Sequence, residues 1–330
     1  MKFKTIVSRT PLRISFVGGG TDFPDFYKND GGEVFSAAIN KYMYLFVNRY
    51  FDEKKCLLKY SQTELVNNIK DIKHPLIRNC LKLTNSWGLD VNSISDVASG
   101  TGLASSSAFT VGLLNALYSI DGKFRSKEFL ARYASHVEIK MTGSPIGKQD
   151  QYITSYGSIN NIKFLKNGNV TCKKFLNKNI LNEFKENLIL LDTGISMNNA
   201  RILSKFKRNI KDKKYKNINL IEIKKLVGLF HSNLKQKNFK SCGEILNYNW
   251  ELKKNISHNI SNKYFDEMFE NLKKLGVYGA KVLGAGGRGY FLIIATKNTQ
   301  NKIKKFFYKN NIIDIGFDFE GSKIVWKDKV

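Results

Sequence analysis

The chain of 330 residues is long enough for two packed domains. Its composition, 42% hydrophobic and 25% charged, is typical of a protein with ordinary apolar cores. No apolar run approaches the length that spans a bilayer, and the N-terminal residues lack the apolar core of a signal peptide, so we expect no membrane partner. The formal net charge of +26 would suit nucleic-acid binding, but without a zinc finger, an aromatic RNA-binding strand or a basic tail we expect no nucleic-acid partner.

The first third of the chain is rich in predicted strands. Apolar and polar residues alternate over 12–16, which predicts a half-buried strand that ends at the glycines 18–20. An apolar run predicts a second strand over 42–47. The pattern over 69–86 predicts helix, with Pro75 near a boundary between two turns.

A glycine- and serine-rich stretch then runs directly into an apolar helical pattern. Residues 100–108 read Gly-Thr-Gly-Leu-Ala-Ser-Ser-Ser-Ala, and the helix is predicted to continue to Ile120. A helix N-terminus attracts anions through its unpaired N–H groups and its dipole, and glycine lets the backbone approach a ligand closely. Serine hydroxyls can cap the helix, donate to phosphate or bind Mg²⁺. We therefore predict a phosphate-binding loop made of Gly100, Gly102, Leu103, Ala104, Ser105, Ser106 and Ser107.

Two commoner phosphate-binding motifs do not fit this sequence. A Walker A loop needs a lysine after its last glycine, and the nearest segment, 143–149, has the wrong spacing and ends in glutamine. The glycine run 284–289 has the letters of a dinucleotide-binding fingerprint, but that fingerprint opens a helix. Here an apolar predicted strand over 290–295 follows, which makes NAD binding a weak interpretation.

The middle of the chain predicts helices on both sides of a turn that contains glycine and proline. Ser126 is a candidate N-cap for a helix over 127–141. Helical character resumes over 149–154, after the turn. Short strands follow, joined by a hairpin turn at Asn167-Gly168.

A polar stretch over 175–187, rich in lysine and asparagine, is the predicted domain boundary, and it divides the chain into domains of residues 1–175 and 176–330. The second half mixes strands and helices without a regular βαβ rhythm or an internal repeat. The expected strands cover 187–191 and 290–295, with two more at the end, and the expected helices cover 198–206, 220–230, 239–252, 265–275 and 298–309. This pattern predicts an α+β fold in two domains.

Four separate segments have one common explanation. They are the glycine-rich end of the first strand (11–22), the serine-rich loop (100–108), Glu138 with residues 143–151, and the glycine run 279–289. In this order they resemble the GHMP kinases, a family of small-molecule kinases, over the whole chain. The resemblance implies an N-terminal ATP-binding domain like domain 2 of ribosomal protein S5 and a ferredoxin-like C-terminal domain.

Within this family, residues 18–24 are most similar to the sugar 1-kinases. The resemblance implies an enzyme that uses ATP and Mg²⁺ and phosphorylates the anomeric hydroxyl of a phosphosugar, D-glycero-D-manno-heptose 7-phosphate, to the 1,7-bisphosphate. It implies a place in nucleotide-heptose biosynthesis for cell-surface polysaccharide. We expect a cytoplasmic protein, because the four cysteines are far apart in the sequence and need no oxidising compartment. The oligomeric state stays open.

The resemblance also assigns roles to individual residues. Asp150 takes or orients the proton of the acceptor hydroxyl, and Arg13 holds Asp150 ionised and offsets charge in the transition state. Ser106 and Glu138 bind Mg²⁺, for which one hydroxyl and one carboxylate beside phosphate oxygens are suitable ligands. The residues implied to contact the sugar are Gly19, Gly20, Thr21, Asp22, Thr193, Gly194, Gly286, Gly287 and Arg288.

Some features depart from the family pattern or allow another interpretation. Gly19 and Gly20 stand where galactokinases carry Glu-His, so we do not expect a pocket specific for galactose. Arg288 interrupts a glycine run, where it would either bind the distal phosphate or face solvent. Without the resemblance, Asp150 is a favourable residue at a helix N-terminus and Glu138 a solvated surface residue. The alternative functions are a kinase for another sugar, such as L-fucose, and a non-catalytic sugar-sensing homologue.

Overall fold

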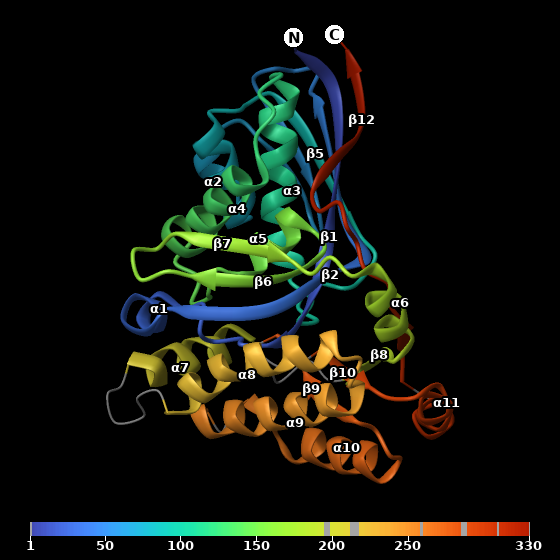
Figure 1. Cartoon of the computed structure of the whole chain (residues 1–330). Coiled ribbons are helices and arrows are strands. Elements are labelled where there is room, and N and C mark those ends of the chain that lie inside the picture. Colours follow the sequence, from blue (N-terminus) through green and yellow to red (C-terminus); the bar gives the residue numbers. More distant parts are fainter. Residues whose placement is uncertain are drawn as a thin grey trace.

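The computed structural model describes residues 2–194, 199–211, 218–257, 260–284, 289–308 and 310–329. In Figure 1 a large sheet with helices against it occupies the upper part of the view, and a layer of helices with a second sheet lies below. None of the described helices is both long enough and apolar enough to cross a membrane.

The large sheet combines strands from both ends of the chain. Its strands are β1 (Phe3–Val17), β2 (Gly32–Arg49), β3 (Cys56–Lys59), β4 (Thr63–Val66), β5 (Leu89–Ser95), β6 (Ile159–Phe164), β7 (Val170–Lys174) and β12 (Lys323–Lys329). Their order is β12-β1-β2-β5-β3-β4, and β6 pairs with both β2 and β7. The pairs are antiparallel except β3 with β5, which run parallel.

The end of β1 follows the alternation that the sequence predicts. Leu12, Ile14 and Phe16 are completely buried in the hydrophobic core. Because successive side chains of a strand point to opposite faces, Arg13 and Ser15 lie on the other face, where both line a pocket. The strand therefore anchors the core and presents Arg13 to the site.

Helices α3 (Ser105–Ile120) and α5 (Gln149–Tyr156) pack against β1 and β2 of this sheet (Figure 1). The same half of the chain also contains α1 (Pro24–Asp30), α2 (Pro75–Thr84) and α4 (Lys127–Ser135), a 3₁₀ turn (Ile69–Asp71) and a π-helical segment (His136–Met141). Helix α3 is buried around almost its whole circumference, as its apolar sequence requires. Ser126 caps α4, since its hydroxyl accepts from the Phe129 N–H at 3.1 Å, which confirms that predicted helix start.

The small sheet has the order β11-β8-β10-β9 and is antiparallel throughout. Its strands are β8 (Leu188–Asp192), β9 (Gly279–Val282), β10 (Tyr290–Ile294) and β11 (Ile312–Asp314). Between β8 and β9 the chain forms α7 (Asn199–Lys211), α8 (Ile218–Lys235), α9 (Phe239–Ile256) and α10 (Lys263–Lys274), and between β10 and β11 it forms α11 (Lys297–Phe306). This strand order, with helices after the first and third strands, is the ferredoxin-like arrangement that the family resemblance implies.

The stretch that the sequence marks as a polar boundary contains a helix, α6 (Lys178–Glu186). The Asn177 side chain caps it by accepting from the Ile180 N–H at 3.1 Å. Ile180, Leu181 and Phe184 share one face and are buried. A few apolar residues at helical spacing are therefore enough to fold this stretch, because tertiary packing supplies most of the stability of a short helix.

The two ends of the described chain lie side by side at the top of Figure 1. Strand β12 pairs antiparallel with β1, from Phe3 opposite Lys329 to Arg9 opposite Lys323. The last strand thus joins the sheet of the first half, although it follows the small sheet in the sequence. The predicted division at residue 175 stays a prediction.

Candidate active site

The serine-rich loop leads into a helix N-terminus with no side-chain cap. Ala104 is the N-cap of α3, has a left-handed backbone (φ 65°) and carries no side-chain acceptor. The three serines therefore lie inside the first turn and do not cap the helix, which was one of the roles that the sequence allowed. The first N–H groups of α3 point out of the helix end, where the dipole favours an anion. This geometry suits a phosphate group.

The loop is fixed between the end of β9 and the first strand. Gly102 has φ 80°, and a Cβ at this position would lie 2.7 Å from the Leu283 carbonyl oxygen, so the close approach requires glycine. The Arg13 N–H donates to the Leu103 carbonyl at 3.0 Å, and Arg13 Nη1 donates to the Gly102 carbonyl at 2.6 Å. Residues from both halves of the chain thus set the position of the loop.

Glu138 reaches the loop from the π-helical segment, where the sequence predicts a continuous α-helix to residue 141. Its carboxylate accepts from the Ser106 hydroxyl at 2.5 Å and the Ser107 hydroxyl at 2.8 Å, and the Gln151 side-chain amide also donates to it. Glu138 is 1% exposed, so it is not a solvated surface residue. Burial raises its pKa, and the three hydrogen bonds act in the opposite direction.

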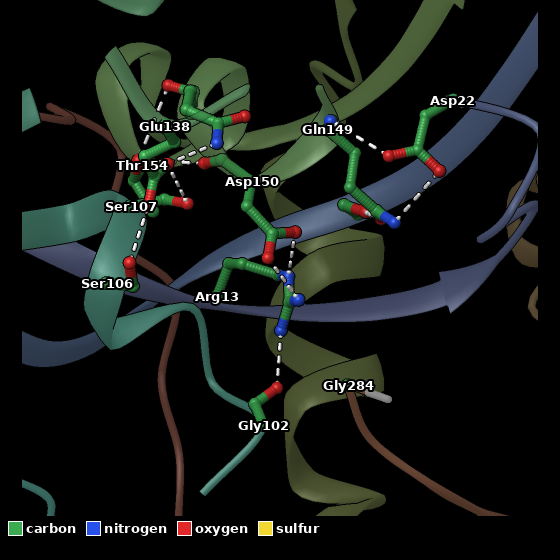
Figure 2. Close-up of polar contacts among 12 residues, drawn as sticks. Arg13, Asp22, Gly102, Ser106, Ser107, Glu138, Gln149, Asp150, Thr154 and Gly284 are labelled. Carbon is green, nitrogen blue, oxygen red and sulfur yellow. Dashed lines mark hydrogen bonds and ion pairs between the residues drawn. The ribbon is translucent and has the colours of Figure 1, made fainter. Parts of the chain in front are cut away.

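Arg13 and Asp150 form a bidentate ion pair, visible in the centre of Figure 2. Arg13 Nε donates to Asp150 Oδ1 at 2.7 Å, and Nη2 donates to Oδ2 at 2.6 Å. The Arg13 side chain is 5% exposed and that of Asp150 is 24% exposed. Asp150 lies in the first turn of α5, but its carboxylate is aimed at Arg13, not at the N–H groups of its own helix. The fork of the guanidinium fixes the orientation of the carboxylate.

Asp22 lies in the same site and is held by the first residue of α5 (Figure 2). It accepts from the Gln149 N–H at 3.1 Å, from the Gln149 side-chain amide at 3.3 Å and from the Gly20 N–H at 3.0 Å. A Cβ at Gly147 would overlap the Asp22 carboxylate, so only glycine lets the backbone of this turn come so close to Asp22. Burial is the main cause that raises the pKa of Asp22; the nearby charge of Asp150 raises it further, and the N–H bond from Gln149 lowers it.

These groups face one pocket between the two halves of the chain. Five residues that the sequence predicts for the site line it: Arg13, Gly19, Gly20, Asp22 and Asp150. The predicted phosphate-binding loop adjoins it through the contact of Arg13 with Gly102. The structure thus brings together segments that lie more than one hundred residues apart in the sequence.

The second half closes this pocket with residues that the sequence analysis missed. Helix α9 contributes Asn249 and Lys253, and β9 contributes Lys281. Lys253 Nζ donates to the Gly284 carbonyl at 2.6 Å, and Lys281 Nζ donates to the Phe16 carbonyl at 2.8 Å. In a chain so rich in lysine, nothing local marks Lys253, whereas Lys281 sits inside an apolar strand pattern that could have identified it.

Other residues predicted to contact the sugar lie elsewhere or outside the described chain. Thr21 is buried and donates to the Gly18 carbonyl at 2.8 Å, which stabilises the turn. Thr193 is buried and donates to the Gly289 carbonyl at 2.8 Å, and Gly194 follows it on the surface. Thr21, Thr193 and Gly194 are not among the described residues that line the pocket, so their contact with sugar stays a prediction. Gly286, Gly287 and Arg288 lie outside the described residues.

A second hollow adjoins the serine-rich loop. Ser105 and Ser106 border it, together with Tyr60, His74 and Phe109. The His74 ring lies 4.6 Å from that of Tyr60 and 5.2 Å from that of Phe109, measured between ring centroids. Burial lowers the pKa of His74, which favours the neutral imidazole. An aromatic hollow next to a phosphate-binding loop suits a flat heteroaromatic ring.

Comparisons with known proteins agree with this geometry. The model of the GHMP kinase N-terminal domain matches residues 73–158, and that of the GHMP kinase C-terminal domain matches residues 230–313. The chain is 28% identical to D-glycero-alpha-D-manno-heptose 7-phosphate kinase of Campylobacter jejuni, over 97% of this chain and 98% of that protein. It is 24% identical to a galactokinase of Pyrococcus furiosus, over 90% and 91% of the two chains.

Solved structures of kinases share the fold. The crystal structure of a D-glycero-D-manno-heptose 1-phosphate kinase from Bacteroides thetaiotaomicron superposes with a TM-score of 0.78 and 20% identity, over 98% of this chain and all of that one. The two family models together cover just over half of the sequence and fall on both halves of the fold. The chain therefore belongs to the GHMP kinases and is a phosphotransferase with an alcohol group as acceptor.

Proposed function

We propose that this chain is a sugar 1-kinase that phosphorylates the anomeric hydroxyl of D-glycero-D-manno-heptose 7-phosphate with ATP, in nucleotide-heptose biosynthesis for cell-surface polysaccharide. The observation that carries this proposal is the position of Arg13, which contacts both Asp150 and Gly102. One guanidinium thereby joins a carboxylate in the pocket to the phosphate-binding loop. The relative from Campylobacter jejuni, matched over nearly its full length, supports heptose 7-phosphate as the acceptor.

In the proposed reaction the anomeric hydroxyl lies beside Asp150. The carboxylate accepts the hydroxyl proton while the oxygen attacks the γ-phosphorus; the new O–P bond forms as the bond to the β-phosphate oxygen breaks, and ADP leaves. Arg13 holds the carboxylate in place and supplies positive charge next to the transferred group. Asp22 accepts hydrogen bonds from sugar hydroxyls and so orients the acceptor.

The residues at the loop fit a Mg²⁺ ion bound to the nucleotide. Ser106 is an exposed residue whose hydroxyl oxygen lies 2.5 Å from Oε1 of the buried Glu138, and a hydroxyl and a carboxylate are oxygen ligands that Mg²⁺ accepts. Such an ion would neutralise charge on the phosphate oxygens. Among the described residues no cluster of three or more His, Cys, Asp or Glu could bind a metal without phosphate, so Ser106 and Glu138 would hold the ion together with the nucleotide.

The hollow with Tyr60, His74 and Phe109 is the proposed site of the adenine ring. It borders Ser105 and Ser106 at the start of α3, so a nucleotide with its base there would have its phosphates at the helix N-terminus. Aromatic side chains offer stacking surfaces for a flat base.

An assay of ADP release with different acceptors tests the proposal. The heptose 7-phosphate, the free heptose, mannose, galactose and L-fucose are compared, and phosphorus NMR locates the new phosphate. We expect the heptose 7-phosphate to be the best acceptor and the product to carry phosphate at C1. Better turnover of a free sugar would contradict heptose 7-phosphate as the acceptor but would still support a sugar kinase. Sugar binding without any turnover would favour a sugar-sensing homologue.

A further inference from the structure

The acceptor pocket carries more positive charge than the proposed phosphoryl transfer needs. Among its described lining residues, Arg13, Lys253 and Lys281 are cationic and only Asp22 and Asp150 are anionic. Arg13 is engaged by Asp150 in a bidentate pair. Within the described part of the chain neither lysine forms an ion pair; each ammonium donates to one backbone carbonyl. A buried charge without a counter-ion is costly, so this pocket is built for an anion.

The two lysines lie on the wall of the pocket formed by the second half of the chain. The Arg13 N–H marks the end of the site next to the phosphate-binding loop, through its bond to the Leu103 carbonyl. Lys281 Nζ contacts the Phe16 carbonyl, three residues further along β1, which corresponds to about 10 Å at the usual rise of a strand. A sugar that extends from Asp150 along this part of β1 would have its far end near Lys281.

The surroundings of the lysines hold them in position. Lys253 lies one helical turn after Asn249 on α9, and both line the pocket. The Asn249 side chain accepts from the Gly18 N–H at 3.3 Å, which fixes α9 against the end of β1. Lys281 is 4% exposed; burial is the main cause that lowers its pKa, and the positive charges of Lys253 and Arg13 lower it further.

We propose that Lys253 and Lys281 bind the distal phosphate of the acceptor and so select a phosphosugar over a free sugar. This inference rests on the proposed function, because it needs an acceptor whose anomeric hydroxyl lies at Asp150. A phosphate dianion accepts charge-assisted hydrogen bonds from both ammonium groups and offsets the positive charge of this wall of the pocket. A free sugar offers neither lysine such a partner.

The test compares Lys253→Met and Lys281→Met with Lys254→Met as the matched control. Lys254 is the next residue on α9 but forms its ion pairs with Glu251 at 3.0 Å and Asp266 at 3.6 Å, outside the pocket. For each protein, kcat/KM is measured with the heptose 7-phosphate and with the free heptose. We expect kcat/KM for the heptose 7-phosphate, divided by kcat/KM for the free heptose, to fall at least about tenfold in each pocket variant, as for one lost charge-assisted bond. In the control this ratio should stay unchanged.

A fall of both kcat/KM values by the same factor in the pocket variants would overturn the proposal, because it would mean that the lysines serve ATP or the fold. Calorimetric binding of the heptose 7-phosphate without ATP gives a second measurement. Loss of this binding in Lys253→Met, with an unchanged melting temperature, supports the proposal, and unchanged binding contradicts it. If the wild type phosphorylates no sugar, the proposed function fails, whereas the calorimetry still decides what the lysines bind.

Discussion

Arg13 donates to both carboxylate oxygens of Asp150 and, with its remaining terminal nitrogen, to the Gly102 carbonyl. One nearly buried side chain on β1 therefore links the start of α5 to the loop before α3. Because the pair is bidentate, Asp150 cannot rotate independently of Arg13. The position of the carboxylate relative to the phosphate-binding loop is thus set by a single guanidinium.

Replacement of Asp150 by asparagine should nearly abolish turnover. Asparagine keeps the shape of the side chain but cannot accept the proton, and the expected loss in kcat is roughly 10²- to 10⁴-fold. The measurement is steady-state ADP release together with nucleotide binding, which should be largely retained. Asp314→Asn, which removes a carboxylate from an exposed pair with Lys304, is the control and should be fully active. Wild-type turnover in Asp150→Asn would refute the assignment.

Ser106→Ala and Glu138→Gln should each raise the Mg²⁺ concentration needed for half-maximal activity. Their combined effect should be smaller than the sum of the single effects, because both residues would bind one ion. Ser107→Ala is the matched control, since Ser107 also donates to Glu138 but is buried away from solvent. A Mg²⁺ titration that is unchanged from the wild type in Ser106→Ala, in Glu138→Gln and in the double variant would exclude this site.

Gly147→Ala should weaken acceptor binding and leave nucleotide binding intact. The added methyl group would overlap the Asp22 carboxylate, so Asp22 or the turn has to move. We expect KM for the sugar to rise by at least about tenfold, as expected for one lost hydrogen bond to a charged group. Gly228→Ala on α8, where a Cβ meets open space, is the control and should keep the KM of the wild type. An unchanged KM in Gly147→Ala would show that Asp22 does not contact the acceptor.

Binding of the phosphosugar should be coupled to proton uptake. The pKa of Lys253 is lowered to about 8, mainly by burial; Arg13 lowers it further, while Asp22 and Asp150 raise it. Burial and the charge of Lys253 also lower the pKa of Lys281. A bound dianion favours the charged ammonium and raises both pKa values, so binding at pH 8 should take up protons, and affinity should fall as the pH rises above about 8.

Calorimetry in buffers of different ionisation enthalpy measures this uptake. At pH 8 the phosphate is already a dianion, since its second pKa is about 6, so the protons that are taken up must bind to groups of the protein. Lys253→Met should take up fewer protons than the wild type, and the free heptose should take up none. Equal uptake in Lys253→Met and the wild type would assign the protons to another group.

Local patterns in the sequence determined much of the fold and the outline of the site. Alternation in β1, the capping Ser126 and the apolar pattern of α3 reflect interactions within a few residues, so the sequence alone reveals them. The same holds for the serine-rich loop, whose glycines and serines are consecutive. The family resemblance of four separated motifs added Arg13, Glu138 and Asp150, which no local pattern distinguishes from surface residues.

Only the tertiary structure decided what surrounds these residues. Ala104, not a serine, precedes α3 with a left-handed backbone, because the loop packs between β1 and the end of β9. Lys253 and Lys281 become pocket residues only when α9 and β9 close over the end of β1. Thr21 uses its hydroxyl to hold its own turn. Contacts between residues hundreds of positions apart, and the burial that shifts their pKa values, arise from packing, and packing is not encoded in any single stretch of sequence.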